Sequence, residues 1–335
     1  MVAQVDNAYI KARPTRLWSR LLSYALFEGR PLTTRGQWIN PLLFKLFALQ
    51  KRLPQMRKSV APVFILGTGR SGTTILGVVL SMHHDVGFLN EPKAIWASLR
   101  EDEDLIGSYH RGAARYRLTA EDAPASLIRE AQRIYGAYLG LTLTRRVVDK
   151  YPELIFRVPF VRQIFPDAKF LFLSRDGWDT CASIDNWSSR LGAEVDGEVH
   201  DWWGVNRRKW NLLVDQIVQE HSDLAPHAKE LRALDDHRAM AATEWIVTMR
   251  EGLQLLDKYP NDVLHVPYAL LCEDPEGMCR RIAKFSGLAN DEVFIDYARQ
   301  VLSPVPAKEE FPLPAMLEAS FRNTCEALRA REVMS

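Results

Sequence analysis

The chain has 335 residues, of which 47% are hydrophobic and 25% are charged. Both fractions are near the averages for soluble globular proteins, so they argue against global disorder and against a membrane-embedded chain. The formal net charge of +1 removes any general electrostatic reason to expect nucleic-acid binding. Length and composition together predict a folded, soluble protein of enzyme size.

Basic residues concentrate at the N-terminus. The first 60 residues carry eleven Lys and Arg against two acidic residues, Asp6 and Glu28, so their formal charge is +9. Apolar residues at spacings of three to five after Leu17 predict a helix with one apolar face. We expect residues 1–58 to form a basic, helical N-terminal extension and residues 59–335 to form the main domain. The extension either packs on the main domain, which is the favoured alternative, or lies on an anionic membrane surface.

The sequence gives no sign of secretion or of a membrane span. No stretch reaches the roughly 18 uninterrupted apolar residues of a spanning helix, and no signal peptide with a cleavage site is recognisable. The four cysteines have neither metal-site spacing nor the density of a disulfide scaffold. We therefore predict a cytoplasmic protein, with peripheral attachment to a membrane through residues 1–58 left open.

Short apolar runs alternate with longer helical segments. Val60–Leu66 predicts a strand, Gly67–Gly72 a turn and Thr73–Met82 a helix. Ala168–Ser174 predicts a second strand ahead of a helix, and Val263–Val266 predicts a third. Short apolar strands separated by helical segments are typical of a parallel sheet that is covered on both faces. The predicted fold class is therefore α/β, with a central, mainly parallel sheet between two helical layers.

The segment from Gly67 to Thr74 reads GTGRSGTT and has the two glycines of a phosphate-binding P-loop. Glycine lets successive backbone amides turn towards a phosphate, and the positive end of the following helix adds to the attraction. The lysine that nucleoside triphosphatases carry after the second glycine is replaced by Thr73, which disfavours a triphosphate with magnesium. Arg70 is the nearby cation, so we expect a phosphate anhydride to bind here; a tight turn without a ligand is the alternative.

The loop resembles the 5′-phosphosulfate loop of sulfotransferases, particularly the tyrosylprotein type. The expected donor-binding residues of the loop are Gly69, Arg70, Ser71, Gly72, Thr73 and Thr74. A second family motif is similar to the residues FLSRDG that end at Gly177, followed by Ser183. The resemblance implies that Arg175 and Ser183 bind the 3′-phosphate of 3′-phosphoadenosine 5′-phosphosulfate, and a guanidinium with a hydroxyl suits a dianionic phosphate.

The resemblance extends over about residues 60–310 and implies a P-loop-like three-layer fold. It also implies transfer of a sulfuryl group from this donor to an acceptor hydroxyl, with adenosine 3′,5′-bisphosphate as the product. No metal is expected. His83 and His84 follow the first helix without further ligands at metal-site spacing, so we interpret them as residues of the helix end rather than as a zinc site.

Three residues are expected to be catalytic. Glu91 follows the apolar segment Val86–Leu89 and matches the glutamate that tyrosylprotein sulfotransferases use as general base; capping of the following helix is the alternative. Lys150 resembles the lysine of the family's Asn-Lys-Asp-Pro segment, which is implied to stabilise the transferring group or the leaving oxygen. Arg70 would act on the phosphosulfate itself.

Two further residues resemble donor-binding positions of the family. Tyr268 resembles a tyrosine at a strand end, although Ala269 replaces the glutamate that follows it there. It is implied to line the nucleotide site, and filling of the core is the alternative. Lys308 resembles a loop lysine that closes over the 5′-phosphate in relatives.

The acceptor is open among a glycan, a glycolipid and a small molecule with a hydroxyl. A tyrosylprotein acceptor would call for an N-terminal anchor, which we do not find. Four tryptophans, Trp187, Trp202, Trp203 and Trp210, cluster after the second motif among basic residues. They either stack on sugar rings of an acidic glycan or, as the favoured alternative, pack as core on the sheet.

Two other functions compete with sulfuryl transfer. A P-loop kinase would bind ATP with magnesium, and Asp176 is the nearest candidate for its metal-binding aspartate. A non-catalytic nucleotide-binding or membrane-attached interaction protein would keep the loop but would not need Glu91 or Lys150.

Overall fold

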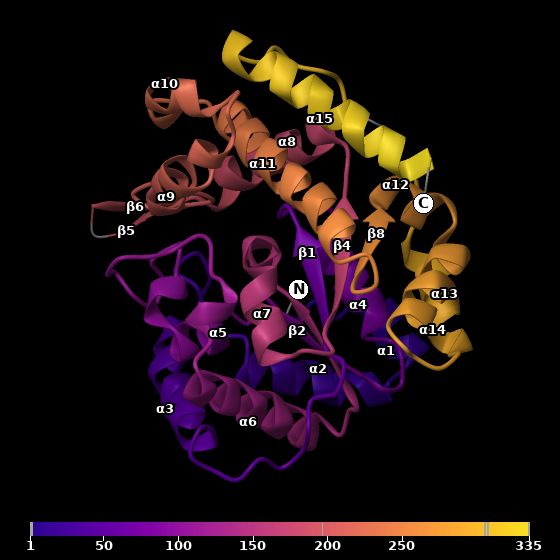
Figure 1. Ribbon diagram of the computed structural model, residues 1–335. Coiled ribbons are helices and arrows are strands. Elements are labelled where there is room, and N and C mark those ends of the chain that lie inside the picture. Colours follow the sequence, from indigo (N-terminus) through magenta and orange to yellow (C-terminus); the bar gives the residue numbers. More distant parts are fainter. Residues whose placement is uncertain (1–2, 196, 305, 307, 334–335) are drawn as a thin grey trace.

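The computed structural model describes residues 3–195, 197–304, 306 and 308–333. Its centre is a parallel sheet with the strand order β2-β3-β1-β4-β8 (Figure 1). The strands are β1 (Val63–Gly67), β2 (Val86–Asn90), β3 (Arg146–Lys150), β4 (Lys169–Ser174) and β8 (Val263–Pro267). Because all five strands run the same way, their carboxyl ends meet at one edge of the sheet.

Both faces of the sheet are buried. Successive residues of a strand point to opposite faces, so Phe64 and Leu66 of β1 join one hydrophobic core while Val63 and Ile65 join a second. A strand covered on both sides has to be apolar throughout, as β1 is. The predicted three-layer α/β fold is confirmed.

Helices form the two outer layers. The core that contains Ile65 is closed by α4 (Thr73–Leu80), α12 (Tyr268–Glu273), α13 (Pro275–Phe285) and α14 (Glu292–Val301). The core that contains Phe64 is closed by α5 (Lys93–Leu99), α6 (Ala125–Thr142), α7 (Val158–Ile164), α8 (Gly177–Leu191) and α11 (His237–Lys258). Farther out along this layer lie α9 (Arg208–Gln216), α10 (Ala228–Arg232) and α15 (Ala315–Val333), and α15 packs on α11 (Figure 1).

Three predicted strands and the first predicted helix are present with shifted ends. The strand predicted for Val60–Leu66 begins at Val63, and the helix predicted for Thr73–Met82 ends at Leu80. The strand β3 was not predicted, because its sequence RVVDK has two apolar residues between charged ones. Its charged end is nevertheless buried, since Asp149 accepts hydrogen bonds from buried aromatic side chains.

A small antiparallel sheet also escaped prediction. It consists of β5 (Ala193–Val195), β6 (Glu198–Asp201) and β7 (Gly204–Val205). Its strands are too short to show an alternating apolar pattern. The turn between β6 and β7 carries Trp202, which becomes important at the site.

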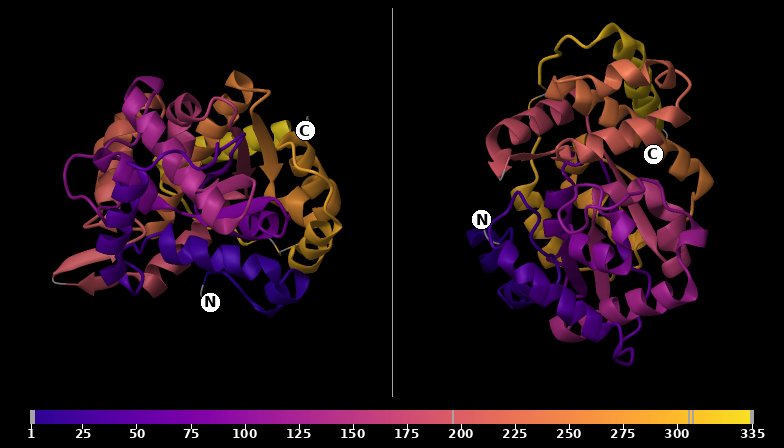
Figure 2. Two further views of the ribbon diagram at one scale, coloured as in Figure 1. Left: turned by 90° about the horizontal axis from the view of Figure 1, so that it is seen from below. Right: turned by 90° about the vertical axis from the view of Figure 1, so that its left-hand side faces the viewer.

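The helices of residues 1–58 are α1 (Asn7–Ala12), α2 (Thr15–Leu26) and α3 (Asn40–Gln50), and they lie along one side of the molecule (Figure 2). Helix α2 covers the edge strand β2: Arg16 and Arg20 donate to the carbonyl oxygens of Val86 and Phe88, at 3.1 Å each. These contacts occupy backbone acceptors that an edge strand otherwise exposes. Helix α2 therefore packs on the main domain, whereas the boundary at residue 58 stays a prediction.

His83 and His84 lie beyond the end of α4, which stops at Leu80. Their ligand atoms and a carboxylate oxygen of Asp291 lie within 4.8 Å of one another. Each is already engaged, because the His83 Nε2 is 2.9 Å from the carbonyl oxygen of Ala289 and the His84 Nδ1 is 2.8 Å from Asp291. We assign these contacts to joining α4 and α14. Among the described residues, no helix is both long enough and apolar enough to cross a membrane.

Candidate functional site

The predicted site residues lie where strands of the sheet end. Arg70 follows β1, Glu91 follows β2, Lys150 ends β3, Arg175 follows β4 and Tyr268 follows β8. The strands are parallel and adjacent, so residues far apart in the sequence reach one edge. This edge is where ligands bind in open α/β folds.

The phosphate-binding loop has a backbone that suits glycine. Gly72, directly before α4, has φ +103°, and a Cβ atom there would lie 2.4 Å from the ring of Tyr268. Arg70 also has a positive φ, of 69°, which is uncommon for a residue other than glycine and frequent at functional sites. Ser71 is buried and its hydroxyl donates to the carbonyl of Thr68 at 2.6 Å, so this side chain holds the turn together.

The structure brings together four residues from three predicted motifs, which we call the donor cluster: Arg70, Arg175, Ser183 and Tyr268. The Arg70 Nε donates to the Ser183 hydroxyl at 3.2 Å, and the Arg175 Nη1 donates to the Arg70 carbonyl at 3.3 Å. The Arg175 guanidinium lies 4.8 Å from the ring centre of Tyr268. The two predicted anion sites are thus neighbours.

The donor cluster carries an excess of positive charge. Burial lowers the pKa of Arg70 and so does Arg175, whereas the charge of Glu91 raises it. Among the described residues, one carboxylate, that of Asp179, contacts the cluster, 3.3 Å from the Arg175 Nη2. Asp179 also accepts from the backbone N–H of Lys308 at 2.7 Å, which places that predicted residue beside Arg175. Two guanidinium groups in one cluster, with one carboxylate in contact, favour an added anion.

Glu91 lies at the centre of a group of opposite charges. One carboxylate oxygen pairs with the Lys150 ammonium, and the other lies 3.5 Å from that of Lys93. Burial by itself would raise the pKa of Glu91, but the two lysines outweigh burial and lower it to about 2. The side chain of Lys150 is 2% exposed and that of Glu91 is 39% exposed, so the carboxylate is the accessible member of the pair.

The helix-capping alternative for Glu91 is wrong. The residue before α5 is Pro92, and no side chain caps this helix. Glu91 instead has φ 51°, and its backbone N–H donates to the carbonyl of Lys150 at 2.7 Å. This local strain directs the side chain away from α5 and towards the end of β3.

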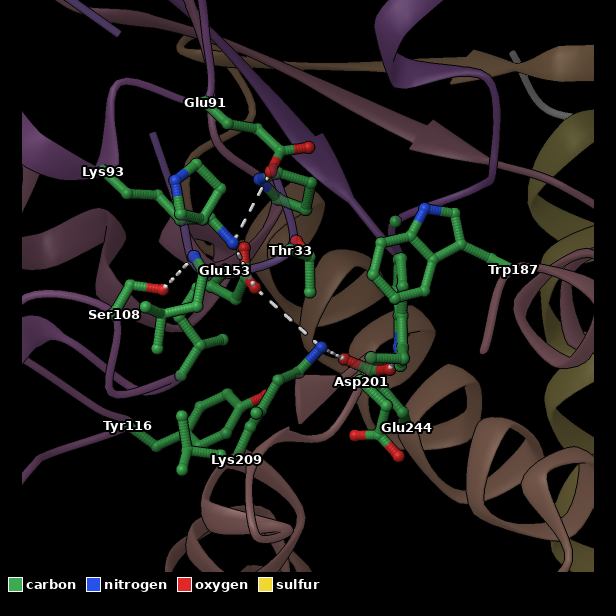
Figure 3. A pocket seen from close by; sticks show the side chains of 18 of the residues that line it. Thr33, Glu91, Lys93, Ser108, Tyr116, Glu153, Trp187, Asp201, Lys209 and Glu244 are labelled. Atoms are coloured by element: carbon green, nitrogen blue, oxygen red, sulfur yellow. Dashed lines mark hydrogen bonds and ion pairs between the residues drawn. The ribbon is translucent and has the colours of Figure 1, made fainter. Parts of the chain in front are cut away.

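A pocket that is partly open to solvent connects Glu91 with the phosphate-binding loop. Its lining includes Gly67 and Gly69 of the loop, Glu91, and four charged residues that we call the charged wall: Lys93, Glu153, Lys209 and Glu244 (Figure 3). The Lys93 Nζ lies 3.3 Å from Glu153, and the Lys209 Nζ lies 3.8 Å from Glu153 and 2.6 Å from Glu244. Positive and negative groups therefore alternate along this side.

Sequence reasoning missed the charged wall as a unit. Lys93 and Glu153 each follow a proline that comes shortly after a strand, β2 or β3, and this repeated pattern was the available signal. Glu244 is the one charged residue in the run 239–249 of α11, all of which is buried. Lys209 is one of the basic residues that lie among the four tryptophans in the sequence, and it was not singled out there.

The four tryptophans divide into two pairs. Trp203 and Trp210 are buried and pack edge to face with ring centres 5.4 Å apart, as the core alternative predicted. Trp187 and Trp202 line the pocket, with ring centres 5.3 Å apart. A Cβ on Gly69 would lie 2.3 Å from the Trp202 ring, so this ring covers the phosphate-binding loop.

A comparison with models of known protein families gives a match. A model described as the sulfotransferase family matches residues 62–228, a range that contains the loop, Glu91, the charged end of β3 and the motif around Arg175. The chain belongs to the sulfotransferase family.

The relatives of known function that this chain resembles are distant. A protein-tyrosine sulfotransferase of Drosophila melanogaster is 26% identical over 223 residues, which are 64% of this chain and 42% of the relative. The omega-hydroxy-beta-dihydromenaquinone-9 sulfotransferase of Mycobacterium tuberculosis is 26% identical over 178 residues, 53% of this chain and 37% of the relative. The chain thus spans about two fifths of the length of these relatives.

Solved structures with similar folds include a sulfotransferase domain from the Synechococcus PCC 7002 olefin synthase. It has a TM-score of 0.47 and 19% sequence identity, and the match covers 82% of this chain and 97% of that one.

Proposed function

We propose that the protein transfers a sulfuryl group from 3′-phosphoadenosine 5′-phosphosulfate to the hydroxyl of an acceptor bound in the pocket. The observation that carries this proposal is the contact between the phosphate-binding loop and the motif around Arg175. Two anion sites joined by the Arg70–Ser183 and Arg175–Arg70 hydrogen bonds suit a nucleotide that carries phosphate groups on both its 5′ and 3′ oxygens.

The donor would lie across the edge of the sheet. Gly69, Arg70, Gly72, Thr73 and Thr74 would bind the 5′-phosphosulfate through backbone amides, hydroxyls and the guanidinium at the start of α4. The 3′-phosphate would bind to Arg175 and Ser183 in place of the hydrogen bonds that these two residues make with Arg70. Tyr268, packed on Gly72 and beside Arg175, would line the nucleotide site. Lys308, which lies in the sequence between α14 and α15, would close over the 5′-phosphate.

Glu91 would accept the proton of the acceptor hydroxyl. As the acceptor oxygen attacks sulfur, the bond from sulfur to the phosphate oxygen breaks, and the bisphosphate product takes that electron pair. A pKa of about 2 keeps Glu91 ionised at neutral pH. When Glu91 gains the proton, the Lys150 ammonium loses its negative partner and becomes available to the leaving oxygen, so one lysine links proton removal to bond cleavage.

Calorimetric titration with adenosine 3′,5′-bisphosphate, beside ATP with magnesium, tests the proposal. Wild type should bind the bisphosphate without magnesium, and Arg175→Ala should bind it roughly 10- to 100-fold more weakly, because a charge-assisted hydrogen bond is lost. Arg322→Ala, an exposed arginine of α15, is the matched control. Tight binding of ATP with magnesium and indifference to the bisphosphate would instead support the kinase alternative.

We also propose that helix α3 contacts an anionic lipid surface, while location in the cytoplasm stays a prediction. Trp38, Leu42 and Leu49 are 81%, 61% and 54% exposed, and their spacing places them along one side of α3 and the turn before it. The segment 29–60 contains seven basic residues and no acidic ones. An exposed apolar stripe flanked by positive charge is typical of helices that lie in the membrane interface.

Sedimentation with vesicles tests this contact. The protein should sediment with phosphatidylcholine vesicles that contain phosphatidylglycerol and stay in solution with phosphatidylcholine alone. The double variant Trp38→Ala, Leu42→Ala should bind roughly 10-fold less, since it removes apolar surface from the interface. The exposed Val333 of α15 provides the control Val333→Ala. Equal sedimentation of wild type and the double variant would contradict the proposal.

A further inference from the structure

The lining of the pocket combines two kinds of side chain, and this bears on what it binds. Besides the charged wall, it contains many apolar side chains, among them Leu32, Ile106, Ile155, Phe156 and Val205. Figure 3 shows Lys93 and Glu153 between Glu91 and Lys209, with Trp187 across the cavity. A molecule that fills the pocket next to Glu91 therefore meets both fixed charges and hydrocarbon.

The charged wall is rigid because it is buried and internally paired. The Lys209 and Glu244 side chains are 4% and 6% exposed, and Glu244 also accepts from the Trp202 indole at 2.7 Å. Buried charges are tolerated when each one has a partner of opposite sign. The pairing leaves the wall itself neutral, so it has no excess charge to attract an ionic ligand.

The whole lining is slightly acidic. It contains two lysines, Lys93 and Lys209, against four carboxylates, since Glu91 and Asp201 join the two glutamates of the wall. Its formal charge is therefore −2. An anionic acceptor, such as an acidic glycan, would meet net repulsion here. The basic residues near the tryptophans do not change this, because Arg207 and Arg208 are held by Asp235 and by backbone carbonyls of the segment 104–112.

Four buried polar atoms of the lining have no hydrogen-bond partner among the described residues: the two ring nitrogens of His200, the Glu153 Oε2 and the Tyr116 hydroxyl. The last two belong together, because the charge of Glu153 acts on Tyr116. Glu153 is 8% exposed and Tyr116 is 0% exposed. Buried polar atoms are nearly always hydrogen-bonded in native proteins, so unpaired ones that line a cavity indicate where a ligand supplies the missing partner.

The protonation states of the two groups define what they bind. Burial raises the pKa of Tyr116, as do the nearby carboxylates of Glu244 and Glu153, so its hydroxyl stays protonated and can donate or accept. Burial opposes ionisation of Glu153, but Lys93 and Lys209 outweigh it and lower its pKa. Its free oxygen therefore accepts hydrogen bonds. A neutral hydroxyl of the ligand can bond to both groups at once, whereas a carboxylate cannot donate to Glu153.

We propose that this pocket selects a neutral, partly apolar acceptor with a second hydroxyl, and that Glu153 and Tyr116 bind that second hydroxyl. The inference rests on the proposed sulfuryl transfer at Glu91. Lys93 lies 3.5 Å from Glu91 and 3.3 Å from Glu153. The Lys93 ammonium therefore sets the distance between Glu91, which takes the proton, and Glu153, which binds the acceptor. Glu153 is a specificity-determining residue, and Lys93 is a positioning residue.

A matched acceptor panel tests the inference. It contains a medium-chain alkane diol, the alkanol of the same length and the hydroxy acid in which a carboxylate replaces the second hydroxyl, each assayed with labelled donor. Wild type should show the highest kcat/KM for the diol. A single well-formed hydrogen bond to a charged group supports a preference of roughly 10-fold or more over the alkanol, and the hydroxy acid should be the poorest acceptor.

Two variants assign the preference to the pocket. Glu153→Gln and Tyr116→Phe should each reduce the diol preference several-fold, through KM more than through kcat, because kcat/KM should fall by a larger factor for the diol than for the alkanol. Tyr116→Phe keeps the ring and its packing, so it gives an answer even if Glu153→Gln folds poorly. Glu318→Gln, on the exposed surface of α15, is the matched control.

The outcomes separate this inference from the proposed function. Failure to bind the bisphosphate would remove sulfuryl transfer itself. Normal bisphosphate binding together with equal transfer to all three acceptors, transfer preferring the hydroxy acid, or no transfer to the panel would overturn the acceptor class alone. A loss of kcat with all acceptors in Tyr116→Phe would show that the phenol acts on the reaction and not on selection.

Discussion

The donor cluster and the charged wall lie on either side of Glu91 and treat charge in opposite ways. The donor cluster contains two arginines, with the Arg175 guanidinium bonded to the Arg70 carbonyl and Asp179 as the contacting carboxylate among the described residues. The charged wall alternates two ammonium groups with two carboxylates. The first arrangement has an excess of positive charge that an anion from outside can neutralise. The charges of the second arrangement cancel, and its Glu153 Oε2 is left without a hydrogen-bond partner among the described residues.

Under the proposed function, this difference would separate the two substrates. A polyanionic nucleotide would be drawn to the donor cluster and a neutral alcohol would bind beside the charged wall, so each would compete poorly for the place of the other. Glu91 interacts with both sides, since Lys93 of the charged wall lies 3.5 Å from one of its oxygens and the charge of Glu91 raises the pKa of Arg70 in the donor cluster. Changes at Glu91 should therefore affect the reaction itself, and changes on either side should affect one substrate only.

Glu91→Gln should have the largest effect. It removes the proton acceptor while keeping the size of the side chain, so kcat should fall roughly 10²- to 10⁴-fold. Bisphosphate affinity should stay within about twofold, because Glu91 lies outside the donor cluster. Steady-state transfer and calorimetry on the same preparation measure both quantities. Full activity in this variant would mean that water or another group accepts the proton of the acceptor hydroxyl.

Lys150→Met should lower kcat roughly 10²-fold at neutral pH, comparable with the loss of one preorganised donor to developing charge. It should also change the pH profile. In wild type the pKa of Glu91 is about 2, so activity should not fall with Glu91 protonation between pH 7 and about 5. Without Lys150, burial raises this pKa, the active carboxylate is lost sooner, and kcat should fall over that range as pH decreases. Lys150→Arg should restore the flat profile.

Two alanine substitutions in one loop should separate the two sides. The added methyl in Gly72→Ala would meet Tyr268 at a strained φ of +103°, and in Gly69→Ala it would meet Trp202 of the pocket. Gly72→Ala should weaken bisphosphate binding roughly 10-fold, and Gly69→Ala should chiefly raise the KM of the acceptor. A Cβ on Gly112 has nothing within 4 Å, so Gly112→Ala is the control. If both variants changed the bisphosphate Kd and the acceptor KM in the same proportion, the two sides would not be independent.

Sequence patterns located the donor side but not the acceptor side, and the reason is physical. A phosphate-binding loop is local: its glycines, Arg70 and the helix that follows are contiguous, so spacing alone predicted them. The resemblance to a family likewise singled out Arg175 and Ser183, and the structure then put them in contact with the loop. Strands with continuous apolar sequences were predicted for the same reason.

The charged wall draws on four separate elements, and no local pattern joins them. Glu153 lies in the 3-10 helix Pro152–Arg157 after β3, a strand that was itself not predicted, and Glu244 lies in the middle of α11. A charged residue in a sequence is usually assigned to the surface. Only the fold reveals that Lys209 and Glu244 are buried partners, and that Trp202 lines a cavity while Trp203 fills the core.

Salt should have the smallest effect and gives the most direct test of the difference in charge. Raising sodium chloride from about 50 mM to about 500 mM shortens the Debye length to less than half. Bisphosphate binding should then weaken several-fold, because it depends on attraction between the nucleotide and the excess positive charge of the donor cluster. The KM of a neutral diol should change less than about twofold, since the charged wall is paired and buried and screening reaches it poorly. A diol KM that rises in parallel with the bisphosphate Kd would mean that the wall opens to solvent when the acceptor binds.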